Sequence, residues 1–314
     1  MSAPRLTVVI PTTGRRPERL AGALAALAAQ DLPRADLEVI LGCDPGVDVP
    51  PTPDGLAVRV VEAPAPASAA AKRNLAWPAA RAPLVAFTDD DCRPAPEWAA
   101  ALIAAAERAP GAFVQGRTEP DPAELRQLWG LAHTQAIQRD SPWHETCNIA
   151  YPRALLERLG GFDESYGQLG GEDTDLGWRA FGSGAGKLYE ERALVWHAVD
   201  RRSFRRAIRE AFRTRDQPQV LARFPHLRRE LVLHVFYRQG HGRLLLALAG
   251  MLTRRRLVAV LAAIPYIKLH LRHYRLSPLS VMRATTHLPV RALADAVEIA
   301  VVAWRGIRRG VIAL

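Results

Sequence analysis

The sequence is poor in the features that mark several classes of protein. Its three cysteines, Cys43, Cys92 and Cys147, form an odd set without CxxC spacing. This excludes a disulfide-based scaffold, argues against a structural zinc site and fits a reducing compartment. Aromatic residues make up only 7% of the chain. Arginines or a proline interrupt every apolar run of the C-terminal part before it reaches the roughly 20 residues of a membrane-spanning helix, so none is expected.

The first residues carry no sign of a secretory signal peptide. Met1–Arg5 lead directly into the short apolar run Leu6–Ile10, and no small-residue cleavage site follows. Together with the cysteine usage, this predicts a cytoplasmic protein.

Positive charge is distributed unevenly along the 314 residues. The whole chain has a formal net charge of +10. Residues 200–314 hold 23 Lys+Arg and 6 Asp+Glu, a net of +17, which leaves 19 basic and 26 acidic residues, a net of −7, in 1–199. The two segments are therefore expected to meet different partners.

Short apolar runs alternate with amphipathic stretches in the first part of the chain. The pattern predicts strands at 6–11, 37–41, 57–61, 84–88 and 113–117, and helices at 17–29, 67–80, 97–108 and 122–139. Strands that alternate with helices indicate an α/β fold with parallel βαβ units, whose ligands bind at the carboxyl ends of the strands. From residue 201 onward the chain is expected to be mostly helical.

Three adjacent carboxylates, Asp89, Asp90 and Asp91, directly follow the predicted strand 84–88. Adjacent carboxylates repel one another, which is unfavourable in free energy. A bound cation best explains why three of them follow one strand. Mg²⁺ or Mn²⁺ would suit, held by one or two carboxylates and by diphosphate oxygens. A solvated acidic turn is the alternative.

A second acidic segment, Glu172–Asp175, follows the glycines Gly170 and Gly171. Acids in the first turn of a helix are favoured by the helix dipole, which is the structural explanation. Glycines also suit a loop that delivers a carboxylate to a substrate. Glu172, Asp175 and Arg179 share one helical face and are expected to brace the helix, which leaves Asp173 as the candidate general base.

Weaker candidates lie at other predicted strand ends and in the neighbouring loops. The segment Pro11–Arg16, Asp44 and the segment Lys72–Asn74 offer cations for phosphates and polar groups for a base and ribose, although arginines near loops are usually only solvated. His197 follows the apolar run Val195–Trp196, where it either completes a metal site or is a structural histidine.

The ordered set of these motifs resembles glycosyltransferase family 2. The segments that carry the resemblance are 8–12, 72–74, 87–91, 148–151, 160–164 and 171–176. The resemblance implies the GT-A fold, a Rossmann-like and mostly parallel sheet flanked by helices, with a catalytic domain at 1–200. Residues 201–314 form a basic, mostly helical C-terminal region outside it.

The resemblance also implies residue roles. Pro11, Thr12, Arg15, Asp44, Lys72, Arg73, Asp89 and Asp90 would bind the nucleotide. Asp89 and Asp91 would be the outer acids of a DxD motif, with Asp91 as the direct metal ligand and His197 beside it. Asp173 would be the catalytic base, while Asn148, Glu172 and Trp178 would contact the acceptor or support the site. Many relatives carry two consecutive acids where this chain has Cys43-Asp44, which leaves the nucleotide base open.

These roles imply a hexosyltransferase that depends on Mn²⁺ or Mg²⁺ and inverts the transferred sugar. The donor would be a nucleoside diphosphate sugar, with UDP preferred over dTDP or GDP, and the acceptor would supply a hydroxyl. A C-terminal region that faces a membrane would suit a lipid-linked or envelope glycan as acceptor, in polysaccharide biosynthesis. Two alternatives stay open: a nucleotidyltransferase on a similar fold, and a non-catalytic protein that binds glycans or lipids.

The basic C-terminal region contains aliphatic stretches at 244–252, 257–267 and 296–304, each bordered by arginines or lysine. Such stretches suit helices that lie in the membrane interface, where apolar burial adds to attraction for anionic lipid. The expected location is the cytoplasmic face of a membrane. Packing on the catalytic domain or on a second subunit of a homodimer is the alternative, and the sparse aromatic residues argue against nucleic acid.

Overall fold

The computed structural model describes residues 3–128, 130–167, 170–271 and 278–314, with the side chains of residues 213, 278–281 and 283 left aside. The chain divides into two compact units, each described by itself below. The N-terminal unit comprises Met1–Glu124, Thr134–Gly167 and Glu172–Ala198. The helical unit comprises Leu125–His133, Gln168–Gly171 and Val199–Leu314.

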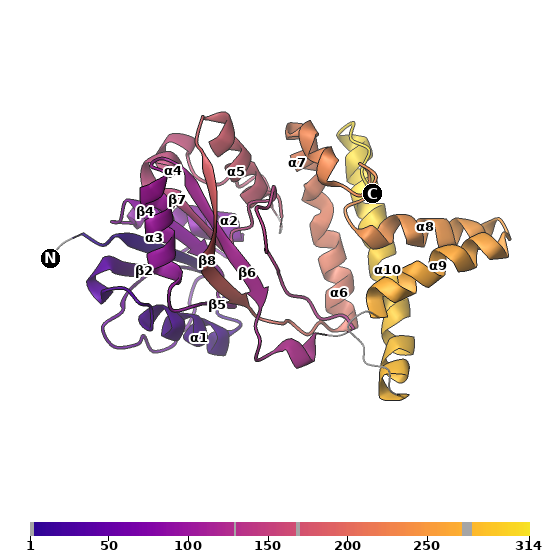
Figure 1. Ribbon diagram of the computed structural model, residues 1–314, viewed down its shortest axis with the longest axis horizontal. Coiled ribbons are helices and arrows are strands. Elements are labelled where there is room, and N and C mark those ends of the chain that lie inside the picture. Colours follow the sequence, from indigo (N-terminus) through magenta and orange to yellow (C-terminus); the bar gives the residue numbers. More distant parts are fainter. Residues whose placement is uncertain (1–2, 129, 168–169, 272–277) are drawn as a thin grey trace. The chain divides into compact units, whose positions relative to one another are not determined.

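A mixed sheet in the order β3-β2-β1-β4-β7-β6-β8-β5 forms the centre of the N-terminal unit (Figure 1). Its strands are β1 (Leu6–Thr12), β2 (Leu37–Cys43), β3 (Ala57–Glu62), β4 (Leu84–Thr88), β5 (Cys92–Pro94), β6 (Phe113–Pro120), β7 (Asn148–Pro152) and β8 (Lys187–His197). Strands β1 to β4 are parallel, β7 runs antiparallel to β4 and β6, and β5 runs antiparallel to β8. The carboxyl ends of β1, β2 and β4 therefore lie at one edge of the sheet.

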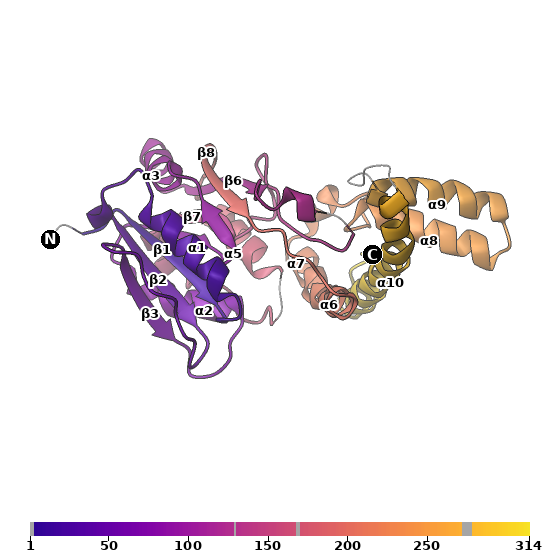
Figure 2. The same cartoon turned by 90° about the horizontal axis from the view of Figure 1, so that it is seen from below.

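Helices cover both faces of this sheet (Figure 2). The helices are α1 (Pro17–Ala28), α2 (Ala69–Ala76), α3 (Trp98–Arg108), α4 (Arg153–Leu159) and α5 (Glu172–Gly182). Successive side chains of a strand point to opposite faces, so Val8 packs in the core with α1 and α3 while Val9 packs in the core with α2, α4 and α5. Both faces are covered, so every residue of β1 is buried, which fits its mainly apolar sequence.

The predicted strands and helices of the N-terminal unit are found with small shifts at their ends, except for one helix. Residues 122–139 do not form the predicted amphipathic helix; only Leu125–Gln127 form a short 3₁₀ turn, and residue 129 lies outside the described part. The backbone of Ile137 instead exchanges hydrogen bonds with Thr118, at 2.9 and 2.8 Å. Gly130 adopts a φ of 64°, which a continuous α-helix does not allow. Tertiary pairing overrides the helical periodicity here.

The helical unit is built from α6 (Phe204–Ala211), α7 (Gln217–Arg223), α8 (Gln239–Leu252), α9 (Arg256–Leu271) and α10 (Pro278–Arg308). The predicted mainly helical C-terminal region is thereby confirmed. Helices α8 and α9 form an antiparallel hairpin, and α10 packs along α6, α7 and α8. In the described part of the chain, we find no helix with the length and apolar character needed to cross a membrane.

One buried carboxylate in β2 holds the amino-terminal edge of the sheet. Glu38, 1% exposed, accepts hydrogen bonds from Thr7 Oγ1 at 2.7 Å and from Arg81 N and Nε at 2.7 and 2.8 Å, and it pairs with Arg59 at 3.2 Å. Burial alone would raise the pKa of Glu38, but the bonds from Thr7 and Arg81 and the charge of Arg59 outweigh it and lower that pKa.

Glu38→Gln is expected to lower the free energy of unfolding by about 2 kcal/mol near neutral pH, because the bonds to the ionised carboxylate are lost. A lowered pKa gives stability that is present above the ordinary carboxyl pKa and lost as the pH falls through the folded-state value. Urea unfolding should therefore show a wild-type advantage that shrinks on acidification. Glu107→Gln, at an exposed ion pair with Arg5, is the control and should change stability by less than about 0.5 kcal/mol. An equal loss in both variants would contradict this account.

Candidate functional site

The candidate site lies where the parallel strands β1, β2 and β4 end. Pro11 and Thr12 are the last residues of β1, Asp44 follows β2, and Asp89 follows β4. The register pairs Thr12 with Cys43, so β1 and β2 end level with one another, and β4 ends next to β1 at the same edge. Parallel α/β sheets bind ligands at this edge, because loops there diverge and leave backbone groups available.

The acidic triplet contacts residues at the end of β1 and in the loop that follows it. Asp90 accepts a hydrogen bond from Thr12 Oγ1 at 2.7 Å, and the Arg16 guanidinium forms ion pairs with both Asp90 and Asp91. Burial raises the pKa of Asp90, although the charge of Arg16 opposes this. From the sequence, Arg16 is among the weak candidates for binding phosphate, and the family resemblance assigns only Arg15 to the nucleotide. In the structure, Arg16 pairs with the acidic triplet.

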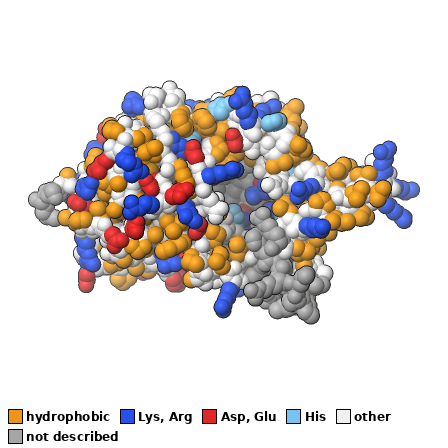
Figure 3. Space-filling view, in the orientation of Figure 1, with side chains coloured by type: hydrophobic (Ala, Val, Ile, Leu, Met, Phe, Trp, Pro, Cys, Tyr) orange, Lys and Arg blue, Asp and Glu red, His pale blue; other side chains and the backbone are white. Residues whose placement is uncertain are grey.

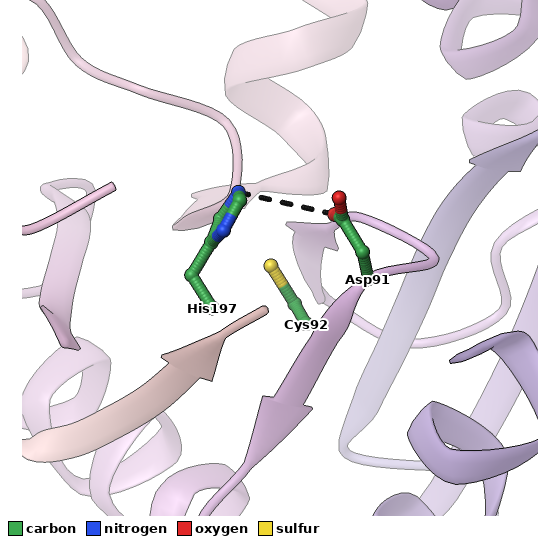
Figure 4. Close-up of side chains that lie close together, drawn as sticks. All are labelled: Asp91, Cys92 and His197. Carbon is green, nitrogen blue, oxygen red and sulfur yellow. Dashed lines mark ion pairs between the residues drawn. The ribbon is translucent and has the colours of Figure 1, made fainter. Parts of the chain in front are cut away.

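Asp91, Cys92 and His197 place three potential metal-ligand atoms within 4.8 Å of one another (Figure 4). The antiparallel pairing of β5 with β8 sets Cys92 opposite His197 and so brings residues far apart in sequence together. Asp91 Oδ1 lies 3.9 Å from His197 Nε2. His197 Nδ1 lies 2.9 Å from the Ala198 carbonyl oxygen, and a proton donated there leaves the lone pair on Nε2, facing Asp91.

The atoms that this cluster offers to a metal ion are oxygen and nitrogen. Burial raises the pKa of the Cys92 thiol well above its ordinary value, and the charge of Asp91 adds to the effect. The thiol therefore keeps its proton, which leaves the Asp91 carboxylate and the His197 imidazole as ligands. Mn²⁺ accepts such mixed ligands and Mg²⁺ accepts the carboxylate, so these residues fit a divalent ion of that kind.

Arg73 connects the acidic triplet to the start of α5. It is 3% exposed, and its guanidinium lies 2.8 Å from Asp89 Oδ1 and 3.4 Å from Glu172 Oε1. The guanidinium carbon lies 5.6 Å from the centre of the Phe162 ring. Burial alone would lower the pKa of Arg73, but the charges of Asp89 and Glu172 raise it. The arginine stays charged and fixes two acidic segments that are distant in sequence.

Lys72, the neighbour of Arg73 on α2, reaches the end of β2. Its Nζ lies 2.8 Å from Asp44 Oδ1, which also accepts a hydrogen bond from Ala67 N at 3.0 Å. A Cβ at Gly42 would lie 2.5 Å from the Lys72 carbonyl oxygen, so glycine there lets α2 approach the strand. Arg15 is exposed. Burial would raise the pKa of Asp44, but the bond from Lys72 and the charges of Lys72 and Arg15 lower it.

Asp173 lies in the first turn of α5 and accepts a hydrogen bond from Thr174 N at 2.8 Å. Burial raises the pKa of Asp173 well above the ordinary aspartate value, and the nearby charges of Glu172 and Glu145 raise it further. The Thr174 bond and the charge of Arg73 act in the opposite direction. A carboxylate with a raised pKa is a stronger base than ordinary aspartate, which suits proton abstraction.

Asn148 lies inside the sheet and stabilises it. It is fully buried, and its Nδ2 donates to the carbonyl oxygens of Arg117 and Ala193, at 2.7 and 2.8 Å. Its Oδ1 accepts a hydrogen bond from Trp98 Nε1 at 2.8 Å. These contacts join β7 to β6 and β8.

Two further residues of α5 secure the helix in place. Trp178 donates a hydrogen bond from Nε1 to the Pro142 carbonyl oxygen at 3.0 Å. Arg179 Nε lies 2.6 Å from Asp175 Oδ2, as the shared helical face predicts. Glu172 does not join that pair directly, because it faces Arg73 instead.

The loop before β7 supplies residues that sequence reasoning did not identify. Glu145 accepts hydrogen bonds from Gln115 Nε2 and Ser141 Oγ, both at 2.9 Å, and its charge acts on Asp173. His144 is 1% exposed with a φ of 53°, and a Cβ at Gly177 would lie 2.1 Å from its ring. The pKa of His144 falls to about 2 through burial and the charge of Lys187. The neutral ring thus packs directly beneath α5, and no local sequence signal marked it.

Comparison with known proteins places the chain among sugar transferases. The Validoxylamine A glucosyltransferase of Streptomyces hygroscopicus subsp. jinggangensis is 29% identical over an alignment that covers 58% of this chain and 52% of the relative. The chain thus spans about half the length of the curated relatives it matches first.

Two solved structures share the fold over nearly the whole chain. One is a mannosyltransferase from Pyrobaculum calidifontis in complex with GDP-Man and Mn²⁺, with a TM-score of 0.55, 20% identity, and coverage of 98% of this chain and 88% of that one. The other is S. aureus TarS 1–349 in complex with UDP-GlcNAc, with a TM-score of 0.52, 16% identity, and coverage of 98% and 92%. These likenesses support the predicted GT-A fold.

A family description, Glycosyltransferase like family 2, matches residues 4–216, which is more than half of the chain and contains all the site residues discussed above. With its GT-A fold, the chain belongs to glycosyltransferase-like family 2.

Proposed function

We propose that the protein transfers a sugar from a nucleoside diphosphate sugar to an acceptor hydroxyl, with inversion at the anomeric carbon. The observation that carries this proposal is the position of Arg73, which lies between Asp89 of the acidic triplet and Glu172, the neighbour of Asp173. This position supports a proposed diphosphate site next to the candidate base, as a displacement between donor and acceptor requires.

The proposed donor side of the site combines basic and acidic side chains. Lys72 and Arg15 supply cations for phosphate, and Asp44, held by Lys72, offers its second carboxylate oxygen to the base or ribose. Thr12 donates a hydrogen bond to Asp90, and Arg16 pairs with Asp90 and Asp91. UDP is the preferred nucleotide, with dTDP and GDP as alternatives. The TarS structure with UDP-GlcNAc and the mannosyltransferase structure with GDP-Man support a donor of this class.

Asp91 Oδ1 and His197 Nε2 would hold a divalent ion, Mn²⁺ or Mg²⁺, with Asp89 on the nucleotide side. When bound, such an ion neutralises the charge that develops on the departing diphosphate. A proton on Nδ1, donated to the Ala198 carbonyl oxygen, would leave the Nε2 lone pair for the ion. The Mn²⁺ in the mannosyltransferase structure supports a metal of this kind.

Asp173 is the proposed base. Its carboxylate takes the proton of the acceptor hydroxyl as that oxygen forms a bond to the anomeric carbon. The bond between this carbon and the diphosphate oxygen breaks on the opposite side, and the nucleoside diphosphate leaves with the bonding electrons. Arg73, buried beside Asp89, adds positive charge near the leaving group.

Arg16→Ala is expected to raise the affinity for Mn²⁺ by about tenfold, because two cations compete for the Asp90 and Asp91 carboxylates. Isothermal titration of the metal-free protein with Mn²⁺ measures this without any turnover. Arg19→Ala, a change in the same segment at a more distant ion pair with Glu124 (3.7 Å), is the control and should leave the affinity unchanged. A lower affinity in Arg16→Ala would mean that Arg16 positions Asp91 for the metal and does not compete with it.

The acceptor is proposed to be a lipid-linked or envelope glycan, with residues 1–200 as the catalytic domain and 201–314 as the part that attaches to the cytoplasmic face of a membrane. The charge of +17 over residues 200–314 supports attachment to an anionic surface. A homodimer remains the alternative use of this region.

A thermal-shift screen of UDP, GDP, dTDP and their sugars tests the donor side. A ligand at about 100 times its dissociation constant stabilises the folded state by about 2.7 kcal/mol, so the preferred nucleotide should raise the melting temperature most. The shift should require Mn²⁺ or Mg²⁺ and should be absent in Asp91→Asn. If no nucleotide shifts the transition, the proposed donor site is wrong.

A further inference from the structure

The hairpin of α8 and α9 exposes most of its large apolar side chains. Leu252 is 85% exposed, Leu257 72%, Met251 67% and Leu261 62%. Figure 3 shows hydrophobic side chains along the part of the molecule that carries α8 and α9 in Figure 1. Contiguous apolar surface of this kind marks an interaction site in a stable protein.

Small residues occupy the interface between the two helices. Ala247, Gly250 and Ala262 are buried, and a Cβ at Gly250 would lie 2.6 Å from Ala259 N. The helices therefore approach closely through glycine and alanine, while leucines and isoleucines face outward. A hairpin of a water-soluble core places its large apolar residues inside, whereas helices in lipid pack through small residues and turn large ones outward.

The base of the hairpin is fixed within the helical unit by a buried polar network. Tyr266 of α9 donates a hydrogen bond to Asp295 of α10 at 2.9 Å, and His270 lies 3.6 Å from the same carboxylate. Arg238, at the start of α8, bonds Glu298 of α10 through Nε, at 2.9 Å to each oxygen. The exposed leucines lie toward the other end, around the turn. The hairpin is therefore fixed at its base, and its apolar side chains are exposed at its turn.

Basic residues occupy the turn of the hairpin, and carboxylates are missing from its sequence. Arg254, Arg255 and Arg256 join α8 to α9, and all three are exposed. Residues 231–314 contain 13 Lys+Arg but only two acids, Asp295 and Glu298, and both are buried. The surface around the hairpin is therefore complementary to an anionic partner.

We infer that the turn-side half of the α8–α9 hairpin, from Leu246 to Leu261, is the element that binds the protein to an anionic lipid bilayer. This inference rests on the proposed membrane attachment and assigns it to one element. Outward leucines would enter the acyl boundary, and the three arginines at the turn would contact lipid phosphates. The inference favours a bilayer over a second copy of the chain, because two copies would bring these arginines together without acidic partners.

Flotation of the full chain with vesicles tests the inference. Wild type should float with phosphatidylcholine vesicles that contain about 30% phosphatidylglycerol, and much less with phosphatidylcholine alone. Leu252→Glu combined with Leu257→Glu should lower the vesicle-bound fraction by about tenfold or more, because both charges would enter the apolar boundary. Replacing Arg254, Arg255 and Arg256 with glutamate should remove the preference for the anionic lipid.

The matched control carries the same two added charges at exposed apolar positions outside the hairpin, Val60→Glu and Leu233→Glu, which are 50% and 77% exposed. It should float like wild type. Equal flotation of the hairpin variant and wild type would overturn the inference. So would a wild-type dimer that Leu252→Glu and Leu257→Glu convert to a monomer without any flotation, because the hairpin would then be a subunit interface.

The thermal transition of each variant shows whether it is folded, and nucleotide binding in solution reports on the N-terminal unit. A protein that binds the donor but does not float would contradict only the hairpin inference. A protein that floats but binds no donor would contradict only the proposed transfer reaction.

Discussion

Asp173→Asn is expected to lower the rate of sugar transfer by about 10³-fold, within the range that general base catalysis contributes. The amide has nearly the size of the carboxylate and can still accept the bond from Thr174 N, so α5 should start normally. It cannot take up the acceptor proton. Nucleotide binding should remain nearly intact, because the proposed donor contacts come from other residues. Release of nucleoside diphosphate with and without acceptor, together with calorimetric nucleotide titration, measures both quantities.

Asp54→Asn, at an exposed aspartate of the N-terminal unit, is the control and should transfer sugar like wild type. The pH profile gives a second readout. A raised pKa means that Asp173 loses its proton at a higher pH than ordinary aspartate, so activity should fall as the pH falls through that raised value. Glu145→Gln removes one charge that raises the pKa and should move this acidic limb to lower pH. Substantial transfer by Asp173→Asn would reject the base assignment.

Arg73→Ala is expected to be the most destabilising of the substitutions considered for the site. It would leave Asp89 and Glu172 without their shared buried partner, and breaking a buried ion pair from one side typically costs about 3–5 kcal/mol of unfolding free energy. Urea unfolding at neutral pH measures the change. Nucleotide binding should weaken as well, since Asp89 would lose the contact that positions it.

Arg73→Lys provides the companion measurement. Lysine keeps the charge but cannot reach both carboxylates with one planar group, so it should recover only part of the stability. Arg81→Ala is the control for losing an arginine. The Arg81 side chain is 60% exposed and also pairs with a buried acid, so this substitution should lower the free energy of unfolding by less than Arg73→Ala does. If Arg73→Ala unfolds at the same urea concentration as wild type, then Arg73 does not hold the two acidic segments together.

Local sequence patterns were sufficient to predict those strands and helices whose burial follows from their own residues. Leu84–Thr88 is buried along its whole length and forms a strand as predicted, and the acids that follow it lie at the sheet edge where ligands bind. The alternating strands and helices and the family motifs together predicted the GT-A fold. The amphipathic pattern at 122–139 was misleading, because the backbone of Ile137 pairs with Thr118 and this contact has no sequence signal.

The geometry of the site depends on contacts between distant segments, which sequence alone could not supply. Asp91 meets His197 only because β5 pairs with β8, and a strand as short as Cys92–Pro94 has no recognisable pattern. Nothing in the sequence distinguishes Arg16 from Arg15, yet of these two neighbours it is Arg16 that pairs with the acidic triplet.

The aliphatic stretches of the C-terminal region also look alike in sequence but differ in the structure. Stretches 244–252 and 257–267 form the hairpin with outward leucines, whereas Ile299 and Val302 of the third are 6% and 0% exposed. The third stretch is thus partly used as core of the helical unit. Only the structure shows which of these apolar residues are buried in the core and which are exposed.

The most direct test of the central claim is to identify what the protein releases from a sugar nucleotide. Incubation with Mn²⁺, a glycan acceptor extract and each of the UDP, GDP and dTDP sugars should release nucleoside diphosphate in amounts equal to the sugar transferred. The new linkage should have the anomeric configuration opposite to that of the donor, and Asp91→Asn and Asp173→Asn should release none above background. Release of a sugar 1-phosphate would indicate that the nucleotidyl group is transferred, as in a nucleotidyltransferase, and retention of configuration would exclude the single displacement. Either result would contradict the account.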